Sequence, residues 1–409
     1  MLLSHIGRRP FSGVSTRRIH VAVNYEVLPD YKRFNQKNNG LMRVVWDPAL
    51  KSCPGRERSA IRDSLERGVP GFTRRDRAFD IATSTIVSAF GTAINRPNSG
   101  LTVWENLNAK YNRAVPPDAG AFDASDPVET RGTVEKVARF MGADLVGFTE
   151  LDERWVYSHH YLPSRDENPP VEIPEGCDQV IVMGLSMDYE MFRTAPTVIM
   201  STETHKNYSQ MTALVSSVAQ FIRTLGYKAV PCLNDTALNV PLAVDAGLGQ
   251  PSRMGLTITD AYGPRVRFCK VFTDLPLGAA KKSVDLGVIE FCEVCEKCVK
   301  ACPVKAPPTG PRTTEGSNIS SSNGVLKWYL NGEKCRHHFA KVATNCGICL
   351  RVCPFNKGKG IHHTIVKWLV KQRIRWVNRL LVRLDDWLGY GEQKDPTFFW
   401  SEKGRKRGA

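Results

Sequence analysis

The apolar and polar positions predict alternating strands and helices in the middle of this 409-residue chain. Residues 180–185 form a continuous apolar run, which is typical of a strand that is covered on both faces. A long helical stretch follows at about 201–225 and ends at Gly226, and a second strand is predicted at 228–232. A strand, a long crossover and a second strand indicate a parallel α/β unit.

Near the C-terminus, residues 361–388 predict a long amphipathic helix with one break. Apolar residues recur there at steps of three to five, close to the helical period: Ile365, Leu369, Ile374, Val377, Leu381, Leu384 and Leu388. Six Lys and Arg residues precede the first acid, Asp385. We expect this helix to pack on the body with its basic face in water, and docking on an anionic membrane or a partner is the alternative.

Eight of the twelve cysteines fall into two tight runs. They read Cys292-x2-Cys295-x2-Cys298-x3-Cys302-Pro303 and Cys335-x10-Cys346-x2-Cys349-x3-Cys353-Pro354. The first has the bacterial ferredoxin spacing, in which three cysteines hold one [4Fe–4S] cluster and the fourth reaches its neighbour. We therefore predict two clusters with crossed ligands, one held by Cys292, Cys295, Cys298 and Cys353, the other by Cys302, Cys335, Cys346 and Cys349.

Zinc and disulfides are the two alternatives for these cysteines. Structural zinc prefers four ligands closed around one ion, usually as two separated pairs, and three cysteines in seven residues suit a cuboidal cluster better. Cysteines this close together would form strained disulfide loops, and no secretion signal accompanies them. The runs therefore predict a protein that moves single electrons.

Length, composition and net charge limit the class of protein but do not identify its function. The chain is long enough for two or three domains, and it is 42% hydrophobic and 24% charged, as in ordinary soluble proteins. No stretch approaches the length of uncharged apolar sequence that a membrane-spanning helix needs. The net charge of +15 favours a membrane surface or an acidic redox partner over nucleic acid, because the charge is scattered and concentrates at the two ends.

The N-terminus contains Arg8-Arg9-Pro10-Phe11, which has the form of a twin-arginine export signal. The apolar segment that should follow such a signal is missing, and a basic, acid-free leader also resembles an organelle transit peptide or a disordered arm. We therefore expect a cytoplasmic protein. Association with the extracytoplasmic face of a membrane is the alternative.

A glycine-rich loop lies between the second predicted strand and an apolar segment at 256–259. It runs from Gly247, Leu248 and Gly249 to Arg253. Such a loop allows a backbone to approach a bulky ligand closely, although an ordinary tight turn uses the same residues.

Taken together, several segments resemble the reductive dehalogenases, corrinoid and iron–sulfur enzymes that remove halogen from organohalides. The similarity extends from about residue 125 to the end, and the order of the segments is its specific feature. The matching segments are Leu225-Gly226-Tyr227, Asn239 to Ala243, Gly247-Leu248-Gly249, Tyr262 to Arg267, Thr273 to Leu277, Phe291 to Pro303, Cys349 to Lys357, and Leu388 to Gly391.

The resemblance implies a mixed fold, α+β or α/β, in which a nitroreductase-like core binds a base-off corrinoid beside a ferredoxin-like domain. The corresponding regions are an N-terminal region with a basic leader (1–124), the corrinoid-binding core (125–287), a domain with two [4Fe–4S] clusters (288–360) and a basic helical tail (361–409). No histidine of the chain lies in a D-x-H-x-x-G arrangement, which is consistent with base-off cobalamin. Gly247, Leu248, Gly249 and Arg253 are the predicted corrinoid-binding residues.

The resemblance also implies three catalytic residues. Tyr208 corresponds to the proton donor, Arg267 to a cation that stabilises the phenolate, and Asn234 to a polar residue facing the substrate. Without the resemblance, the three would be interpreted as helix packing, a surface ion pair and a turn. Trp104, Trp155, Tyr157 and Phe192 are aromatic residues among which the sequence does not select those lining a substrate pocket.

The implied reaction uses low-valent cobalt, with electrons passing from the more exposed cluster to the second. The implied partners are an organohalide, a reduced electron donor (ferredoxin, flavodoxin or quinone-linked) and a membrane anchor protein. The two alternatives are an epoxyqueuosine reductase-like enzyme that modifies tRNA and, in another class, a two-cluster electron carrier without corrinoid. About 280 residues precede the cysteines, far more than a simple carrier needs.

Overall fold

The computed structural model describes residues 25–91, 120–358 and 360–401, so the basic leader and Trp104 lie outside the described residues. Its main sheet has four strands in the order β1-β2-β6-β3, and every neighbouring pair is antiparallel. The strands are β1 (Leu145–Glu150), β2 (Gln179–Ser186), β6 (Val266–Thr273) and β3 (Ala229–Cys232). A small second sheet pairs β4 (Gln250–Pro251) with β5 (Thr257–Ile258).

The two predicted strands of the parallel unit exist and run in the same direction, but they are not neighbours in the sheet. Both β2 and β3 pair with β6, which lies between them. Because both are antiparallel to β6, they run in the same direction, as the crossover helix α6 (Val198–Thr224) requires. The strand β6 comes later in the chain and lies between them, so neighbouring strands of the sheet are antiparallel rather than parallel.

Each face of the sheet is covered by its own hydrophobic core, because alternate residues of a strand point to opposite faces. Ile181 and Val271 belong to the core on the side of α6. Val180 and Phe272 belong to the core on the opposite side, together with Trp155. The prediction that the 180–185 strand is covered on both faces is therefore confirmed.

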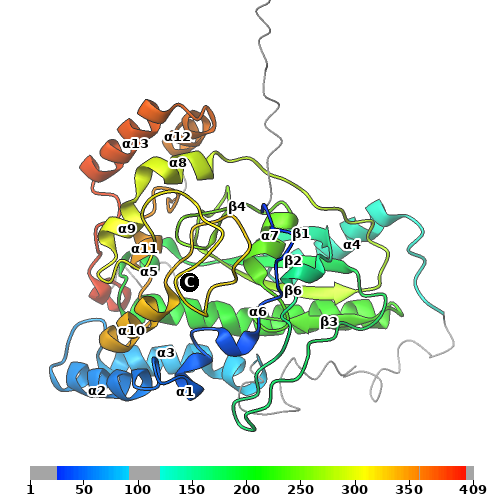
Figure 1. Ribbon diagram of the computed structural model, residues 1–409, viewed down its shortest axis with the longest axis horizontal. Helices are drawn as coiled ribbons and strands as arrows, with labels where there is room; N and C mark the ends of the chain where they lie inside the picture. Colours follow the sequence, from blue (N-terminus) through cyan, green and yellow to red (C-terminus); the bar gives the residue numbers. More distant parts are fainter. Residues whose placement is uncertain (1–24, 92–119, 359, 402–409) are drawn as a thin grey trace, which may run out of the picture.

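Helices of the N-terminal region lie along the outer side of α6, and α3 packs directly on it (Figure 1). Thr73 begins α3 with a capping box, since its side chain accepts from the Asp76 backbone while Asp76 accepts from the Thr73 backbone. The helices before the cysteine runs are α1 (Arg43–Trp46), α2 (Cys53–Glu66), α3 (Arg74–Ile86), α4 (Pro127–Phe140), α5 (Tyr189–Arg193), α6 and α7 (Asn239–Asp245).

Short helices carry the cysteine runs, and they lie at the end of α6 away from β3 (Figure 1). They are α8 (Val288–Cys295), α9 (Lys297–Ala301), α10 (Gly332–Val342) and α11 (Ile348–Arg351). The long surface excursion predicted at 307–323 contains no regular helix or strand. The cysteine region therefore consists of short helices joined by long loops.

The tail forms two helices, α12 (Ile361–Lys371) and α13 (Arg375–Trp387), so the predicted break is confirmed. The buried carboxylate of Asp385 on α13 pairs with Lys297 of α9 at 2.5 Å and with Lys357. These ion pairs anchor the tail on the cysteine region, as the packing interpretation expects. None of the helices in the described ranges is both long and apolar enough to span a bilayer.

The last described segment, η4 (Pro396–Trp400), returns to the N-terminal helices. The indole nitrogen of Trp400 donates a 2.7 Å hydrogen bond to Asp76, and the rings of Phe79 and Phe399 stack at 4.8 Å. The last described segment is therefore packed on α3, which lies more than 300 residues earlier in the chain.

Candidate functional site

One cavity in the cysteine region is lined by all four cysteines that the sequence assigns to the first cluster. Its walls also contain aromatic and charged side chains. The cysteines are Cys292, Cys295, Cys298 and Cys353, and the other lining residues include Arg253, Phe291, Glu296 and Phe355. Cys353 comes from the second run, so the crossed arrangement of ligands is present in the fold.

The thiols of this first group are strongly perturbed by burial. Burial, followed by the charges of nearby cysteines, raises the pKa of Cys295 and of Cys298 to about 12. For Cys353, burial comes first and the neighbouring Cys292 second, and its pKa is well above the ordinary value. Such thiols stay protonated near neutral pH unless iron replaces the proton, so cluster insertion must release protons.

The other four cysteines form a second group around Cys349. Burial raises the pKa of Cys349 well above its ordinary value, and the contributing neighbours after burial are Cys346, Cys335, Cys298 and Cys302. The second group thus contains the four ligands predicted for the second cluster.

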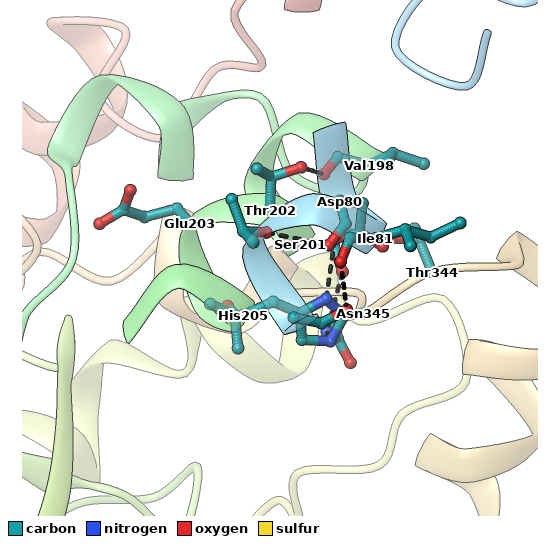
Figure 2. A network of polar contacts seen from close by, with 12 residues as sticks. Asp80, Ile81, Val198, Ser201, Thr202, Glu203, His205, Thr344 and Asn345 are labelled. Carbon is teal, nitrogen blue, oxygen red and sulfur yellow. Dashed lines mark hydrogen bonds and ion pairs between the residues drawn. The ribbon is translucent and has the colours of Figure 1, made fainter. Parts of the chain in front are cut away.

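A polar network holds the loop of the second group against α3 and α6 (Figure 2). The side-chain nitrogen of Asn345, next to Cys346, donates to Ser201 at 3.0 Å and lies 3.4 Å from Nε2 of His205. Because an amide nitrogen only donates, Nε2 accepts, and Nδ1 of His205 carries the proton donated to Asp80 at 2.8 Å. Two helices, α3 and α6, thus fix the position of the residue next to Cys346.

Arg253, predicted to bind a corrinoid, lies against the first group of cysteines. Its guanidinium donates to the carbonyl oxygens of Cys292 at 3.0 Å and of Pro308 and Gly310 at 2.9 Å each. It also lies 4.6 Å from the ring of Trp328, and the residue is only 1% exposed. Arg253 therefore stabilises the loops around the first cluster site.

The glycine-rich loop packs closely against the chain itself. A Cβ atom at Gly249 would lie 2.2 Å from the carbonyl oxygen of Ile258, so only glycine fits beside β5. Gly247 has φ +73°, a left-handed conformation that favours glycine, and Leu248 packs on the core that contains Trp155. These contacts explain the residues by packing, and their binding of a corrinoid stays a prediction.

The three predicted catalytic residues lie together at one edge of the sheet. Tyr208 is on α6, Arg267 is on β6 and Asn234 is in the loop after β3. The Nδ2 atom of Asn234 donates a 2.8 Å hydrogen bond to the phenol oxygen of Tyr208. The guanidinium carbon of Arg267 lies 5.4 Å from the centre of the tyrosine ring. Three segments distant in sequence thus converge on one phenol.

A buried lysine that the sequence analysis did not select organises the loop carrying Asn234. Lys270 of β6 is 0% exposed, and burial lowers its pKa. Its ammonium donates to Oδ1 of Asn239 at 2.8 Å and to three carbonyl oxygens at 2.7–2.9 Å, those of Leu233, Asp235 and Ala237. The position of Lys270 between the apolar residues Cys269 and Val271 of β6 was the available signal for this role.

Lys270 sets the direction of a chain of hydrogen bonds that ends at Tyr208. A lysine only donates, so Oδ1 of Asn239 is an acceptor and its Nδ2 must donate. Nδ2 of Asn239 is 2.9 Å from Oδ1 of Asn234, which leaves Nδ2 of Asn234 to donate to Tyr208. The phenol oxygen is therefore an acceptor in this chain, and its own proton is available to another group.

The candidate aromatic residues are distributed differently. Trp155 and Phe192 are buried in separate hydrophobic cores. Tyr157 is next to the site, because its hydroxyl donates to the backbone carbonyl of Asn234 at 3.2 Å. Burial raises the pKa of Tyr157 above its ordinary value, followed by the charge of Asp235. Tyr157 therefore supports the Asn234 loop as a neutral phenol.

Comparisons with known proteins agree with this architecture. Residues 291–356 match the family described as a 4Fe-4S double cluster binding domain, which confirms the predicted pair of clusters. A tetrachloroethene reductive dehalogenase of Sulfurospirillum multivorans is 38% identical over 361 residues, covering 81% of this chain and 71% of that protein.

Two solved structures share the fold. A catabolic reductive dehalogenase, NpRdhA, in complex with 3-bromo-4-hydroxybenzoic acid has a TM-score of 0.68 and 21% identity, covering 90% of this chain. A reductive dehalogenase whose structure suggests a mechanism for B12-dependent dehalogenation has a TM-score of 0.69 and 20% identity, covering 92%. This chain spans about half the length of each solved chain, 48% and 49%.

Proposed function

The chain belongs to the reductive dehalogenase family, as its sequence resemblance predicted, and we propose that it removes halogen from an organohalide. Electrons would pass through two [4Fe–4S] clusters, and Tyr208 would supply the proton. The observation that carries the proposal is the phenol of Tyr208 held between Asn234 and Arg267. The comparisons establish the family, and the roles of these residues are inferred from their chemistry.

The polarity of the hydrogen-bond chain makes Tyr208 a suitable acid. Because its oxygen accepts from Asn234, its own hydrogen can point toward the reacting carbon. The positive charge of Arg267 near the ring favours the phenolate that forms when this proton leaves. Asn234 stabilises the same negative oxygen through its N–H group.

The overall reaction balances with two electrons and one proton. The carbon–halogen bond breaks, halide leaves, a carbon–hydrogen bond forms, and Tyr208 is afterwards reprotonated from solvent. A corrinoid bound in the core would supply the low-valent cobalt that breaks the carbon–halogen bond. The residues of the chain would orient the substrate, hold the proton and exclude water from the site.

Two classes of substrate follow from the related proteins. The Sulfurospirillum relative acts on tetrachloroethene, and the solved NpRdhA complex contains a brominated hydroxybenzoate. A chlorinated alkene and a halogenated phenol are therefore the substrates to compare. The electron donor and a membrane anchor protein are further proposed partners.

Association with a membrane is supported by the exposed face of α13. Trp376, Leu380, Leu384 and Trp387 form an exposed apolar stripe at helical spacing. Exposed arginines of the same helix, including Arg375 and Arg379, supply positive charge beside this stripe. Such a face suits an anionic membrane surface or an anchor protein.

The test is anaerobic reconstitution of the chain with iron, sulfide and cobalamin. We expect about eight irons and one cobalt per chain, and turnover of tetrachloroethene or a bromophenol with a chemical reductant. Iron without retained cobalt would reject the dehalogenase proposal in favour of an electron carrier. Turnover of an epoxyqueuosine-containing tRNA, with none of either organohalide, would favour the tRNA-modifying alternative.

A further inference from the structure

An open hollow of about 790 Å³ lies between α2 and α10, outside the site of Tyr208. Its lining includes Arg56 and Ser59 of α2, and His337, His338 and Lys341 of α10. The sequence analysis singled out none of these residues, and neither the cysteine ligands nor the proton donor accounts for them.

The hollow lies beside the second group of cysteines. Val304, which also lines it, is two residues after Cys302, and His337 is two residues after Cys335. A separation of two residues limits the distance between Cα atoms to roughly 8 Å. The wall of the hollow is therefore built from the same short segments that hold the second cluster.

The second cluster is also the more accessible of the two. All four of its cysteines are partly exposed. In the first group, by contrast, three of the four cysteines are buried, namely Cys295, Cys298 and Cys353. An electron arriving from outside therefore meets the second cluster first, and the hollow is on that side.

The charges of the hollow suit an acidic partner. Arg56 and Lys341 are exposed and form no ion pair among the described residues. Asp63, the acid in the lining, is paired with Arg67 at 2.5 Å. Nε2 of His338 is buried and has no hydrogen-bond partner within the described part of the chain, although the residue lines the hollow. The hollow thus offers free cations and an unsatisfied ring nitrogen.

We propose that this hollow docks an acidic, single-electron carrier protein of the ferredoxin class, which reduces the second cluster. The inference rests on the proposed function and names the partner of its electron-entry side. In each encounter one electron leaves the reduced cluster of the carrier, which becomes oxidised, and enters a four-iron cluster of this chain. No proton moves. Electron-transfer contacts of this kind are small and are steered by complementary charge.

The experiment measures cluster reduction rather than dehalogenation. Reconstituted protein is mixed in a stopped-flow instrument with a reduced, acidic plant-type [2Fe–2S] ferredoxin at low salt, and bleaching of the four-iron absorption is followed. The test variant is Arg56→Glu/Lys341→Glu. The matched control is Lys32→Glu/Lys136→Glu, which changes the net charge equally at exposed positions outside the hollow and away from the basic face of α13.

We expect the test variant to be reduced at least tenfold more slowly than the wild type, and the control within about twofold of it. The difference should shrink at about 0.5 M salt, because screening shortens electrostatic attraction to a few ångströms. Dithionite, a small reductant, should reduce all three proteins alike. If the glutamate variant fails to fold, Arg56→Gln/Lys341→Gln should also be reduced more slowly by ferredoxin, with a smaller change in rate.

Equal slowing of the control would mean that net charge alone matters, and it would overturn the proposal. An unchanged rate in the folded test variant, or no transfer from ferredoxin to the wild type, would also overturn it. In each of these cases dithionite reduction would still establish the clusters. Absence of reducible clusters from the wild type would contradict the proposed function itself.

Discussion

Asn234 donates a 2.8 Å hydrogen bond from its side-chain amide to the phenol oxygen of Tyr208. The direction of this bond is fixed from a distance, because the buried ammonium of Lys270 makes Oδ1 of Asn239 an acceptor. The amide of Asn239 in turn makes Oδ1 of Asn234 an acceptor. One charged group on β6 thus determines which way two amides face and leaves the tyrosine proton free.

Tyr208→Phe should lower dehalogenation by roughly a hundredfold or more, because the variant retains the ring but loses the acidic proton. Iron and cobalt content should be unchanged. Tyr227→Phe is the matched control, since the hydroxyl of Tyr227 donates to the backbone oxygen of Phe122, outside the site of Tyr208. Steady-state turnover with a chemical reductant checks this, and wild-type turnover by the Tyr208 variant would reject its role as the acid.

Lys270→Met should reduce the free energy of unfolding by about 3 kcal/mol, because it removes the ammonium donor from four oxygen acceptors in the interior. Turnover should also fall, since the amides of Asn239 and Asn234 lose their fixed direction. Lys327→Met is the control. The ammonium of Lys327 lies over the ring of Tyr329, and no hydrogen bond from it is found among the described residues.

Chemical denaturation followed by circular dichroism, with turnover at matched cofactor loading, measures both effects of the lysine substitution. A Lys270 variant that is as stable as the wild type would show that water replaces the ammonium as hydrogen-bond donor to these oxygens. Loss of stability with normal turnover would separate the structural role of Lys270 from its role in orienting the amides.

Because the ligands are crossed, a cysteine of one run should be needed for the cluster held mainly by the other run. Cys353→Ser should remove the first cluster, as Cys292→Ser does, although Cys353 belongs to the second run. Cys302→Ser should remove the second cluster, as Cys346→Ser does. Iron content and electron paramagnetic resonance of the reduced proteins distinguish the two clusters. If each variant lost the cluster of its own run, the crossed assignment would be wrong.

Asp152 should make the fold sensitive to acid. Burial opposes its ionisation, but hydrogen bonds from Arg154 and Lys281 outweigh burial and hold its pKa at about 2. The folded-state pKa is below the ordinary value of 3.8, so this stabilisation is complete above about pH 4 and is lost as pH falls through about 2. The difference corresponds to ~2 kcal/mol.

Unfolding free energies measured from pH 5 to pH 2 for wild type and Asp152→Asn check this expectation. The wild type should lose stability across the window, and the variant should be less stable at pH 5 but flatter below it. Parallel profiles for the two proteins would show that other carboxylates dominate the acid response.

The sequence predicted the elements near the site better than it predicted their arrangement. Apolar runs located β2 and β3, and helical periodicity located α6, because these signals depend on neighbouring residues alone. The insertion of β6 between β2 and β3 depends on which strand pairs best across the sheet, a comparison that periodicity does not make. Local sequence patterns therefore predicted that the strands and the helix exist, whereas packing across the sheet determined the order of the strands.

The same distinction holds at the candidate site. The spacing of the cysteines predicted the crossed groups, and the family resemblance selected Tyr208, Arg267 and Asn234. Lys270 was missed, because a single lysine in a strand is usually an exposed position and only the fold shows that it is buried. Arg253 contacts the loops around the first group of cysteines, which its loop sequence did not reveal, and its binding of a corrinoid stays a prediction.

The contact of Trp400 with Asp76 also affects how the protein is made. The two residues are 324 positions apart, so at about 5–20 residues per second the ribosome needs roughly 16–65 s to deliver the second after the first. During that interval α3 has emerged without its closing aromatic partners. Until residue 400 has been made, this part of α3 lacks the aromatic side chains that cover it, so the packing of α3 is completed long after the helix itself has been synthesised.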